Sequence, residues 1–251
     1  MTIEVAIQCY HFQRRLCWML SSIMQQRRYK HQKLPEIIVS VAYCKDEGNP
    51  KTNDIIVHFR GRGLDISAIE YPNIERLQYR GLTRNDQLKL TRADWIMFAD
   101  SDMVYHPRFF GKMQHLLETD FKDNPHCLYS QRYSTTLDET LLLVDNLYYP
   151  RTVKNAYDHI MLLPGKKKSN VGAGYMHLAN VKLLRENHGG LYQPEDKKID
   201  HGWVNTWQKA KSDMHFRRKL GGEKIPLPIQ GHIQHERDSI EGNKTHIETQ
   251  R

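Results

Sequence analysis

Two carboxylates stand two positions apart at the end of an apolar run. The run begins at Trp95, and Asp100 and Asp102 follow it with Ser101 between them. Carboxylates at this spacing can share a divalent cation, directly or through water, and hard oxygen ligands suit Mg²⁺ or Mn²⁺. The same Asp-x-Asp pattern is also common in turns. The triplet alone therefore leaves two interpretations open, a metal site that holds phosphates and a plain turn.

The segments around this triplet alternate between two patterns. Short apolar runs predict strands, and segments with helical apolar spacing separate them. We expect strands at 3–10, 36–44, 65–71 and 94–100, and helices from the first strand to about residue 28, at 54–63 and at 80–93. This order predicts an α/β fold with a mostly parallel central sheet flanked by helices. Ligands of open α/β sheets bind beyond the carboxyl ends of the strands, where Asp100 and Asp102 would lie.

The second half of the chain is less regular. Its pattern predicts a helix at 107–121, a strand at 126–135, a helix with a loop within 140–169, and a helix that begins near residue 200. No repeat, low-complexity segment or linker divides the chain. We therefore expect a single domain across residues 1–251, whose last ten residues are loosely held.

The composition suits a globular protein with a sizeable core. The chain has 251 residues, 39% of them hydrophobic and 26% charged. No run approaches the roughly 18 apolar residues of a membrane span, and the N-terminus lacks the layout of a signal peptide. We expect a cytoplasmic location. The four cysteines have no paired short spacing and favour buried, reduced thiols over a zinc site or a disulfide framework.

The net charge of +8 favours anionic partners. The stretch 11–35 contains no acidic residue and carries Arg14, Arg15 and further basic residues among apolar ones. A basic amphipathic helix there could contact lipid head groups or nucleic acid. The alternative is a helix packed on the sheet with a solvated basic rim, and the usual role of such faces favours it.

The stretch 80–103 resembles a segment of the GT-A glycosyltransferases, especially those of the family-2 type. In that segment an Arg-Asn pair opens a helix, an Ala-containing stretch leads into an apolar strand, and the strand ends in Asp-x-Asp. The matching positions are Arg84, Asn85, Ala93, Asp100 and Asp102. The resemblance, which covers roughly residues 3–245, implies the GT-A fold, a Rossmann-like fold of nucleotide-diphospho-sugar transferases.

The first two strands resemble the nucleotide-binding part of the same family. The segment "VAIQCYHFQRRL" is similar to the family's first strand and its nucleotide-binding loop. The segment "IIVSVAYCKDEG" is similar to the second strand, which ends in an acidic residue near the base; Asp46 is the nearest match and Glu47 is its rival. The resemblance implies that the donor is bound by Gln8, Tyr10, Asp46, Arg84, Asn85, Asp100 and Ser101.

The implied catalytic base follows a glycine-containing acceptor-side segment, "NVGAGYMHLANVKLLRENHGGLY". After this segment the family places Glu-Asp at the start of a helix, and the Asp is the proposed base of inverting members. In this chain Ile199 stands where Glu is usual, and Asp200 is kept. The resemblance therefore implies Asp200 as the base, with Glu195 and Asp196 as alternatives.

A histidine near the end of the chain completes the metal site in the family. The segment "GHIQHERD" matches that position, with His235 as the first match and His232 as the second. The implied metal ligands are Asp100, Asp102 and His235, and the implied cofactor is Mn²⁺ or Mg²⁺.

The resemblance implies a metal-dependent glycosyltransferase that moves a sugar from a nucleotide-sugar, here a UDP-sugar, to an acceptor hydroxyl with inversion. Residues 1–105 would form the nucleotide-sugar half, 106–240 the acceptor half and 241–251 a tail. The basic charge is compatible with an anionic acceptor, which could be a glycan, a lipid-linked molecule or a modified base in nucleic acid.

Two other classes of protein stay open. A nucleotidyltransferase also pairs Asp-x-Asp with Mg²⁺, but the first strand here is not followed by a glycine-rich phosphate loop. A non-enzymatic basic nucleic-acid-binding module would suit the charge. The chain shows no zinc, helix-turn-helix or RNA-binding motif in its favour.

Overall fold

The computed structural model describes residues 1–30, 33–45, 50–128, 131–145, 147–165, 167–169, 176–195 and 211–233. The strands are β1 Thr2–Cys9, β2 Glu36–Cys44, β3 Asp65–Tyr71, β4 Trp95–Asp100, β5 Met103–Val104, β6 His126–Leu128, β7 Arg132–Ser134, β8 Lys167–Ser169, β9 Met176–Asn180, β10 Glu223–Lys224 and β11 Gln230–His232. The helices are α1 Gln13–Met24, α2 Thr52–Gly61, α3 Glu75–Gln78, α4 Arg80–Leu90, α5 Phe109–Glu118, α6 Leu137–Val144, α7 Ala156–Met161, α8 Val181–His188 and α9 Lys211–Leu220.

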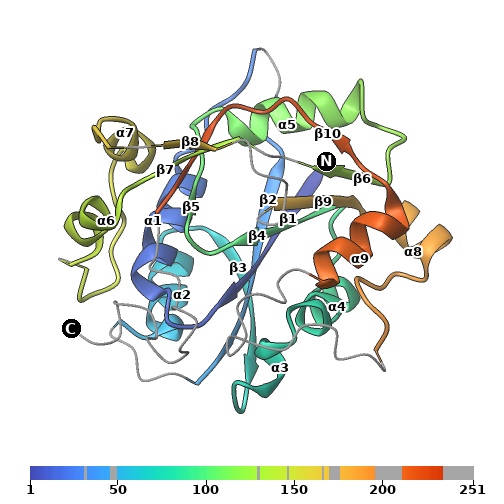
Figure 1. The fold of residues 1–251 in the computed structure, drawn as a ribbon, viewed down its shortest axis with the longest axis horizontal. Helices are drawn as coiled ribbons and strands as arrows, with labels where there is room; N and C mark the ends of the chain where they lie inside the picture. The colour runs from blue at the N-terminus through green and yellow to red at the C-terminus, as the bar shows by residue number, and fades with distance from the viewer. Residues whose placement is uncertain are drawn as a thin grey trace.

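A central sheet runs through the molecule in the order β10-β6-β9-β4-β1-β2-β3 (Figure 1). Strands β1 to β4 are parallel to one another, and β9 joins antiparallel between β4 and β6. The first hundred residues therefore form the predicted alternation of parallel strands and helices. The predicted α/β class is confirmed.

The two faces of the central sheet are buried under different helices. Along β4, Trp95 and Met97 belong to the core that contains apolar side chains of α1, α2 and α5. The intervening Ile96 and Phe98 belong to a second core with side chains of α4, α8 and α9. Successive strand residues point to opposite faces, so a strand covered on both sides must be apolar at nearly every position. This is why the run before Asp100 is continuous.

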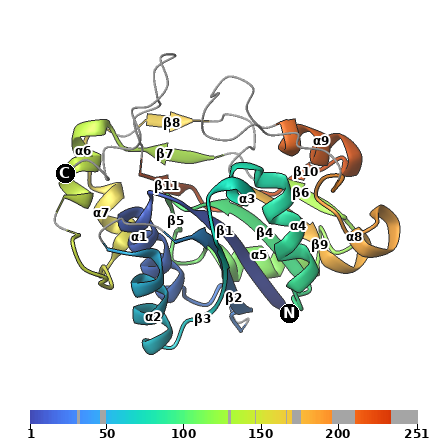
Figure 2. The same ribbon diagram turned by 90° about the horizontal axis from the view of Figure 1, so that it is seen from below.

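A smaller sheet, in the order β5-β11-β7-β8, stands beside the carboxyl end of β4 (Figures 1 and 2). Strand β5 begins directly after the aspartate pair and is antiparallel to β11, with Met103 opposite His232. Strand β11 is also parallel to β7, with His232 opposite Ser134. Through this pairing the small sheet places β11, a strand near the end of the described chain, beside the end of β4.

Several boundaries differ from the sequence-based expectations. Helix α1 ends at Met24, so the basic residues from Arg27 onward lie in the following loop. The stretch 126–135 forms two strands, β6 and β7, in place of the one expected. In α1 the side chains of Arg14 and Arg15 are buried and do not face solvent. The interpretation of α1 as a packed helix is correct in its apolar part and wrong in placing these two arginines on a solvated rim.

The four cysteines have the state that their spacing predicts. All four cysteines are free and buried. Among the described residues, every helix is too short or too polar to cross a membrane.

Candidate active site

The ends of β1 and β4 lie side by side in one register. Gln8 is paired with Asp100, and Ala6 lies one step back on the same face of β1. The Gln8 side chain donates from Nε2 to the carbonyl oxygen of Arg80, at 2.8 Å. This bond links β1 to the first turn of α4. Two neighbouring strand ends and the start of a helix therefore converge beside the first aspartate of the triplet.

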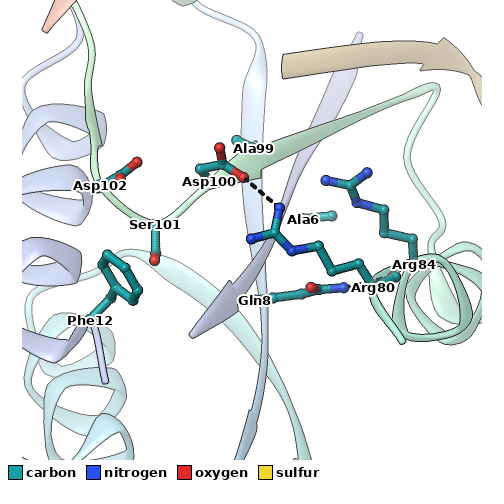
Figure 3. Close-up of a pocket in the computed structure, with 9 residues that line it drawn as sticks. All are labelled: Ala6, Gln8, Phe12, Arg80, Arg84, Ala99, Asp100, Ser101 and Asp102. Atoms are coloured by element: carbon teal, nitrogen blue, oxygen red, sulfur yellow. Dashed lines mark hydrogen bonds and ion pairs between the residues drawn. The ribbon is translucent and has the colours of Figure 1, made fainter. Parts of the chain in front are cut away.

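A pocket of about 540 Å³, part of it open to solvent, occupies this corner. Figure 3 shows the Arg80 and Arg84 side chains extending from α4 toward the side of the pocket where Asp100 lies. Asp102 lies across Ser101 from them, next to α1. The lining residues are Ala6, Gln8, Phe12, Arg80, Arg84, Ala99, Asp100, Ser101 and Asp102. The pocket therefore combines two carboxylates with two guanidinium groups.

Asp100 carries competing electrostatic influences. Its carboxylate keeps 33% of its surface exposed and lies 4.0 Å from Nη1 of Arg80. Burial by the surrounding protein atoms is the largest influence and raises its pKa above the usual value. Arg80 and Arg84 act in the opposite direction, whereas the nearby Asp102 carboxylate raises the pKa further. A cation bound between the two carboxylates would relieve their repulsion and favour the ionised form of Asp100.

Asp102 contacts a histidine from the far end of the chain. Its Oδ2 lies 3.1 Å from Nε2 of His232, and the other ring nitrogen, Nδ1, lies 3.1 Å from Oγ of Ser134. The backbone holds this arrangement, because the Ile233 N–H donates to the Asp102 carbonyl oxygen at 2.9 Å. Both side chains are buried. The ring is thus fixed at both nitrogens, as the imidazole of a metal-ligating histidine is when a second group orients it.

The Asp102–His232 pair fits a hard divalent cation. Ligands at right angles around an ion with bonds of about 2.1 Å are about 3 Å apart, close to the observed separation of Oδ2 and Nε2. Within the described part of the chain, no three His, Cys, Asp or Glu side chains close around one point. The pair therefore offers two ligands, and a third must come from a shift of Asp100, from the undescribed residues or from a bound phosphate.

Arg84 forms the back wall of the pocket. The side chain is buried, and Nη1 donates to Asp213 Oδ1 and, at 2.5 Å, to the hydroxyl of Tyr192. The guanidinium carbon lies 4.8 Å from the centre of the Tyr192 ring and 5.5 Å from that of Phe98. The arginine is therefore held by an anion, a hydroxyl and two aromatic faces while it lines the pocket.

Asn85, the next residue on α4, is fully buried and does not line the pocket. Its Oδ1 accepts from the backbone N–H groups of Tyr192 and Gln193, at 2.6 and 3.1 Å. Its Nδ2 donates to the carbonyl oxygen of Gln193 at 2.7 Å. The side chain of Gln193 also packs against Gly81, where a Cβ would collide with it. Asn85 thus anchors the segment that leads toward Asp200, and a contact with the donor stays a prediction.

Glu195, an alternative for the base, is committed to other partners. It accepts from Lys89 at 2.8 Å and from Asn85 at 3.2 Å, and Arg76 lies 3.6 Å away. Burial would raise the pKa of this carboxyl, but Lys89, Asn85 and Arg76 together hold it below the usual value. Such a carboxylate is a weak proton acceptor. Glu195 therefore holds the segment 191–195 against α4 through Lys89 and Asn85.

The structure brings together five of the predicted site residues: Gln8, Arg84, Asp100, Ser101 and Asp102 line one pocket. Tyr10 lies in a neighbouring cluster, packed against Ala42, Cys44 and Leu77. The predicted residues Asp46, Glu47, Asp196, Asp200 and His235 lie outside the described residues.

Sequence reasoning missed Arg80 as a pocket residue. A signal was present, because Arg80 precedes Arg84 by four positions and residues at that spacing share one face of a helix. His232, the second-ranked histidine, contacts Asp102, and His235 lies outside the described residues. Phe12, which lines the pocket from the N-terminal side of α1, had no signal of its own in the sequence.

Comparison with solved structures identifies GT-A-type glycosyltransferases of the same fold. S. aureus TarS superimposes with a TM-score of 0.55 at 16% identity, over 93% of this chain and 37% of that chain. TarS 1–349 in complex with UDP gives 0.55 at 15% identity, over 93% of this chain and 61% of that chain. The complex of TarS 1–349 with UDP-GlcNAc gives 0.52 at 15% identity, over 95% of this chain and 60% of that chain.

This chain spans about two fifths of TarS and about three fifths of its 1–349 form. No family model matches the sequence, and no curated protein matches it. Identity this low carries information about the fold alone. The chain therefore has the GT-A glycosyltransferase fold, with a mostly parallel central sheet, as the resemblance in its sequence implied.

Proposed function

We propose that this protein is a metal-dependent glycosyltransferase that moves a sugar from a nucleotide-sugar to an acceptor hydroxyl. The donor that we propose first is a UDP-sugar. One observation carries the proposal. On a GT-A fold, at the carboxyl ends of β1 and β4, two aspartates and two arginines line one pocket, and an oriented histidine contacts one of the aspartates. This combination matches a donor that carries a diphosphate together with a divalent cation.

The metal ligands in this proposal are Asp102 and His232, with Asp100 and His235 as further candidates. Bound Mn²⁺ or Mg²⁺ supplies charge neutralisation to a diphosphate leaving group. Ser134 orients the His232 ring through Nδ1, which leaves Nε2 directed at Asp102. Asp100 and Asp102 repel each other, and the pocket therefore favours a cation between them.

The two arginines suit the donor's phosphates. The Arg80 side chain is 43% exposed and lies 4.0 Å from Asp100, so an anion that enters from solvent can reach its guanidinium. Arg84 is fixed and buried, and it supplies a stationary positive charge at the back of the pocket. Guanidinium groups bind phosphate oxygens through two parallel hydrogen bonds. Arg80 would bind and release the donor, and Arg84 would orient it.

Asp200 is the proposed base, which removes the proton of the acceptor hydroxyl as the oxygen attacks the anomeric carbon. Base catalysis of this kind contributes roughly 10²–10⁴-fold to a rate. The proposal includes inversion at the anomeric carbon. NMR of the product's anomeric configuration tests it, and a retained configuration would remove the role of Asp200 as base. The acceptor in this proposal is anionic, in keeping with the charge of +8.

A thermal-shift panel tests the donor class. UDP-, GDP- and dTDP-sugars are added with and without Mn²⁺, because a ligand that binds only the native state raises stability by mass action. We expect stabilisation by a UDP compound that requires the metal. Equal stabilisation with and without Mn²⁺ would contradict the metal, and a dependence on GDP or dTDP compounds would reassign the donor.

A further inference from the structure

Helix α9 reaches the wall of the donor pocket through one buried carboxylate. Asp213 is 2% exposed and Arg84 is 3% exposed, and the two side chains form an ion pair between α9 and α4. A buried guanidinium needs a counter-ion, because an uncompensated charge in the interior is strongly unfavourable. Burial alone would raise the pKa of Asp213, but Arg84 above all holds it below the usual value. The carboxylate is therefore ionised and directed at Arg84.

A stacked pair of aromatic rings supports the same guanidinium. Arg84 lies 4.8 Å from the centre of the Tyr192 ring, which is stacked at 4.1 Å on Phe216 of α9. The Tyr192 hydroxyl accepts from Arg84 Nη1 and donates to Asp213 Oδ1 at 2.6 Å. Tyr192 therefore restrains where the guanidinium lies, and the ion pair with Asp213 restrains which way it is turned. Asp213 belongs to α9, and Tyr192 is stacked on Phe216 of the same helix, so both restraints depend on where α9 lies.

Behind Asp213 stands a pair of buried imidazoles that cannot replace Arg84 as its partner. His126 Nδ1 lies 2.8 Å from the Gly221 carbonyl oxygen, and His126 Nε2 lies 3.2 Å from His177 Nδ1. Each neutral imidazole carries one N–H hydrogen. His126 Nδ1 must carry its hydrogen to donate to the carbonyl oxygen, so His126 Nε2 accepts and His177 Nδ1 carries the hydrogen between the two rings. His177 Nε2, 3.9 Å from Asp213 Oδ2, is then an acceptor that faces an acceptor. The charge of Asp213 is consequently offset from the other side, by Arg84.

Arg84 connects Asp213 to the pocket. The Arg84 side chain lines the same pocket as Asp100 and Asp102, so the way Asp213 holds it bears directly on the shape and charge of that pocket. Helix α9 follows residues 196–210, the stretch that contains the predicted base Asp200. Before that stretch, Tyr192 is held to α4 by Asn85. After it, Asp213 is held to α4 by Arg84.

We propose that Asp213 is a positioning residue, which holds the Arg84 guanidinium at the angle that the donor's phosphates require. Through this pair the placement of α9 governs donor affinity. The inference rests on the proposed function for the identity of the ligand, but the arrangement of Arg84 can be measured without any ligand.

The test combines three variants: Asp213→Asn, Arg84→Met and the double variant. UDP is the probe, titrated in the presence of Mn²⁺. If Asp213 acts through Arg84, Asp213→Asn weakens UDP binding at least tenfold in the wild-type background and less than twofold in the Arg84→Met background. Equal factors in the two backgrounds, or no effect in either, would overturn the proposal.

A second variant and a second readout keep the test decisive. Asp213→Glu retains the charge but displaces the carboxylate, so we expect a folded protein with UDP affinity weakened at least fivefold; unchanged affinity would count against positioning even if Asp213→Asn does not fold. Side-chain ¹⁵N NMR of Arg84 gives the ligand-free readout. Slow rotation of the guanidinium in the wild type should become fast in Asp213→Glu, and identical rotation would refute the inference. If the wild type binds no nucleotide, the proposed function fails, and the NMR result still decides the role of Asp213.

Discussion

Nε2 of His232 lies 3.1 Å from Oδ2 of Asp102, although 130 positions separate the two residues in the chain. The pairing of β5 with β11 brings them together, because it places His232 opposite Met103, the residue that follows Asp102. The proposed metal-binding corner therefore forms only when the late strand has joined the small sheet. Its two parts, the aspartate pair and the histidine, can be tested separately.

Replacement of Asp102 by Asn should abolish metal binding and leave the fold intact. The amide keeps the shape of the carboxylate and can still contact His232, but it lacks the negative charge that a hard cation requires. We expect Mn²⁺ affinity, measured by isothermal titration calorimetry, to fall at least 100-fold, about 2.7 kcal/mol. Asp123→Asn is the matched control, since that carboxylate is 89% exposed and far from the pocket lining. Mn²⁺ affinity unchanged in Asp102→Asn would exclude the metal site.

His232→Gln and His235→Gln separate the two histidine candidates. If His232 ligates the metal, His232→Gln should weaken Mn²⁺ by 10-fold or more and His235→Gln should have little effect. If His235 is the ligand and His232 only orients Asp102, both changes weaken the metal, and His235→Gln does so more strongly, because an orienting group is typically worth 10–100-fold. Paramagnetic broadening of the imidazole proton signals by Mn²⁺ identifies the closer ring. Broadening of neither ring would contradict both assignments.

Asn85→Ala should destabilise the protein and slow turnover while leaving UDP affinity nearly unchanged. The change removes the acceptor for the N–H groups of Tyr192 and Gln193, and each buried donor left without a partner costs about 1–3 kcal/mol. The melting temperature should fall by roughly 4–24 °C, because two donors lose about 2–6 kcal/mol together and each kcal/mol lowers it by about 2–4 °C in a domain of this size. The control is Asn73→Ala, at an exposed position. A large loss of UDP affinity would instead support a direct contact between Asn85 and the donor.

The sequence contained the information for the donor half of the fold. The strands around Asp100 are buried on both faces, so their apolar runs stand out against the helical spacing between them. Parallel strands end at one edge, and this rule predicted Asp100 and Asp102 at the ligand edge, where the structure pairs Asp100 with Gln8. Predictions of this kind succeed because each depends on local pattern and on one general rule of sheet topology.

Long-range contacts explain what the sequence could not provide. Arg15 belongs by its position to the polar residues of α1, yet its Nε donates to the Ile233 carbonyl oxygen, 218 positions away, and the side chain is buried. The contact of His232 with Asp102 depends on the register of a three-residue strand, for which no local pattern exists. Asp213 had no signal either, since an aspartate in the first turn of a helix is ordinarily a solvated residue at its amino end.

The buried imidazole pair should make the protein less stable in mild acid. Burial lowers the pKa of His126 to about 4 and that of His177 to about 3. An unfolded histidine titrates near 6.5, so between these values the unfolded chain binds more protons than the folded one. The free energy of unfolding should therefore decrease as the pH falls below about 6.5, by up to about 1.4 kcal/mol per pH unit for each histidine.

Urea unfolding between pH 4.5 and 7.5 measures this slope, and His177→Gln should reduce it by up to about 1.4 kcal/mol per pH unit. The absolute stability of that variant is not the readout, because the change also removes the contact with His126. His159→Gln is the matched control, since His159 is an exposed histidine. If the slopes of the wild type and His177→Gln coincide, His177 is not held neutral in the folded protein, and the charge of Asp213 would then be shared between His177 and Arg84.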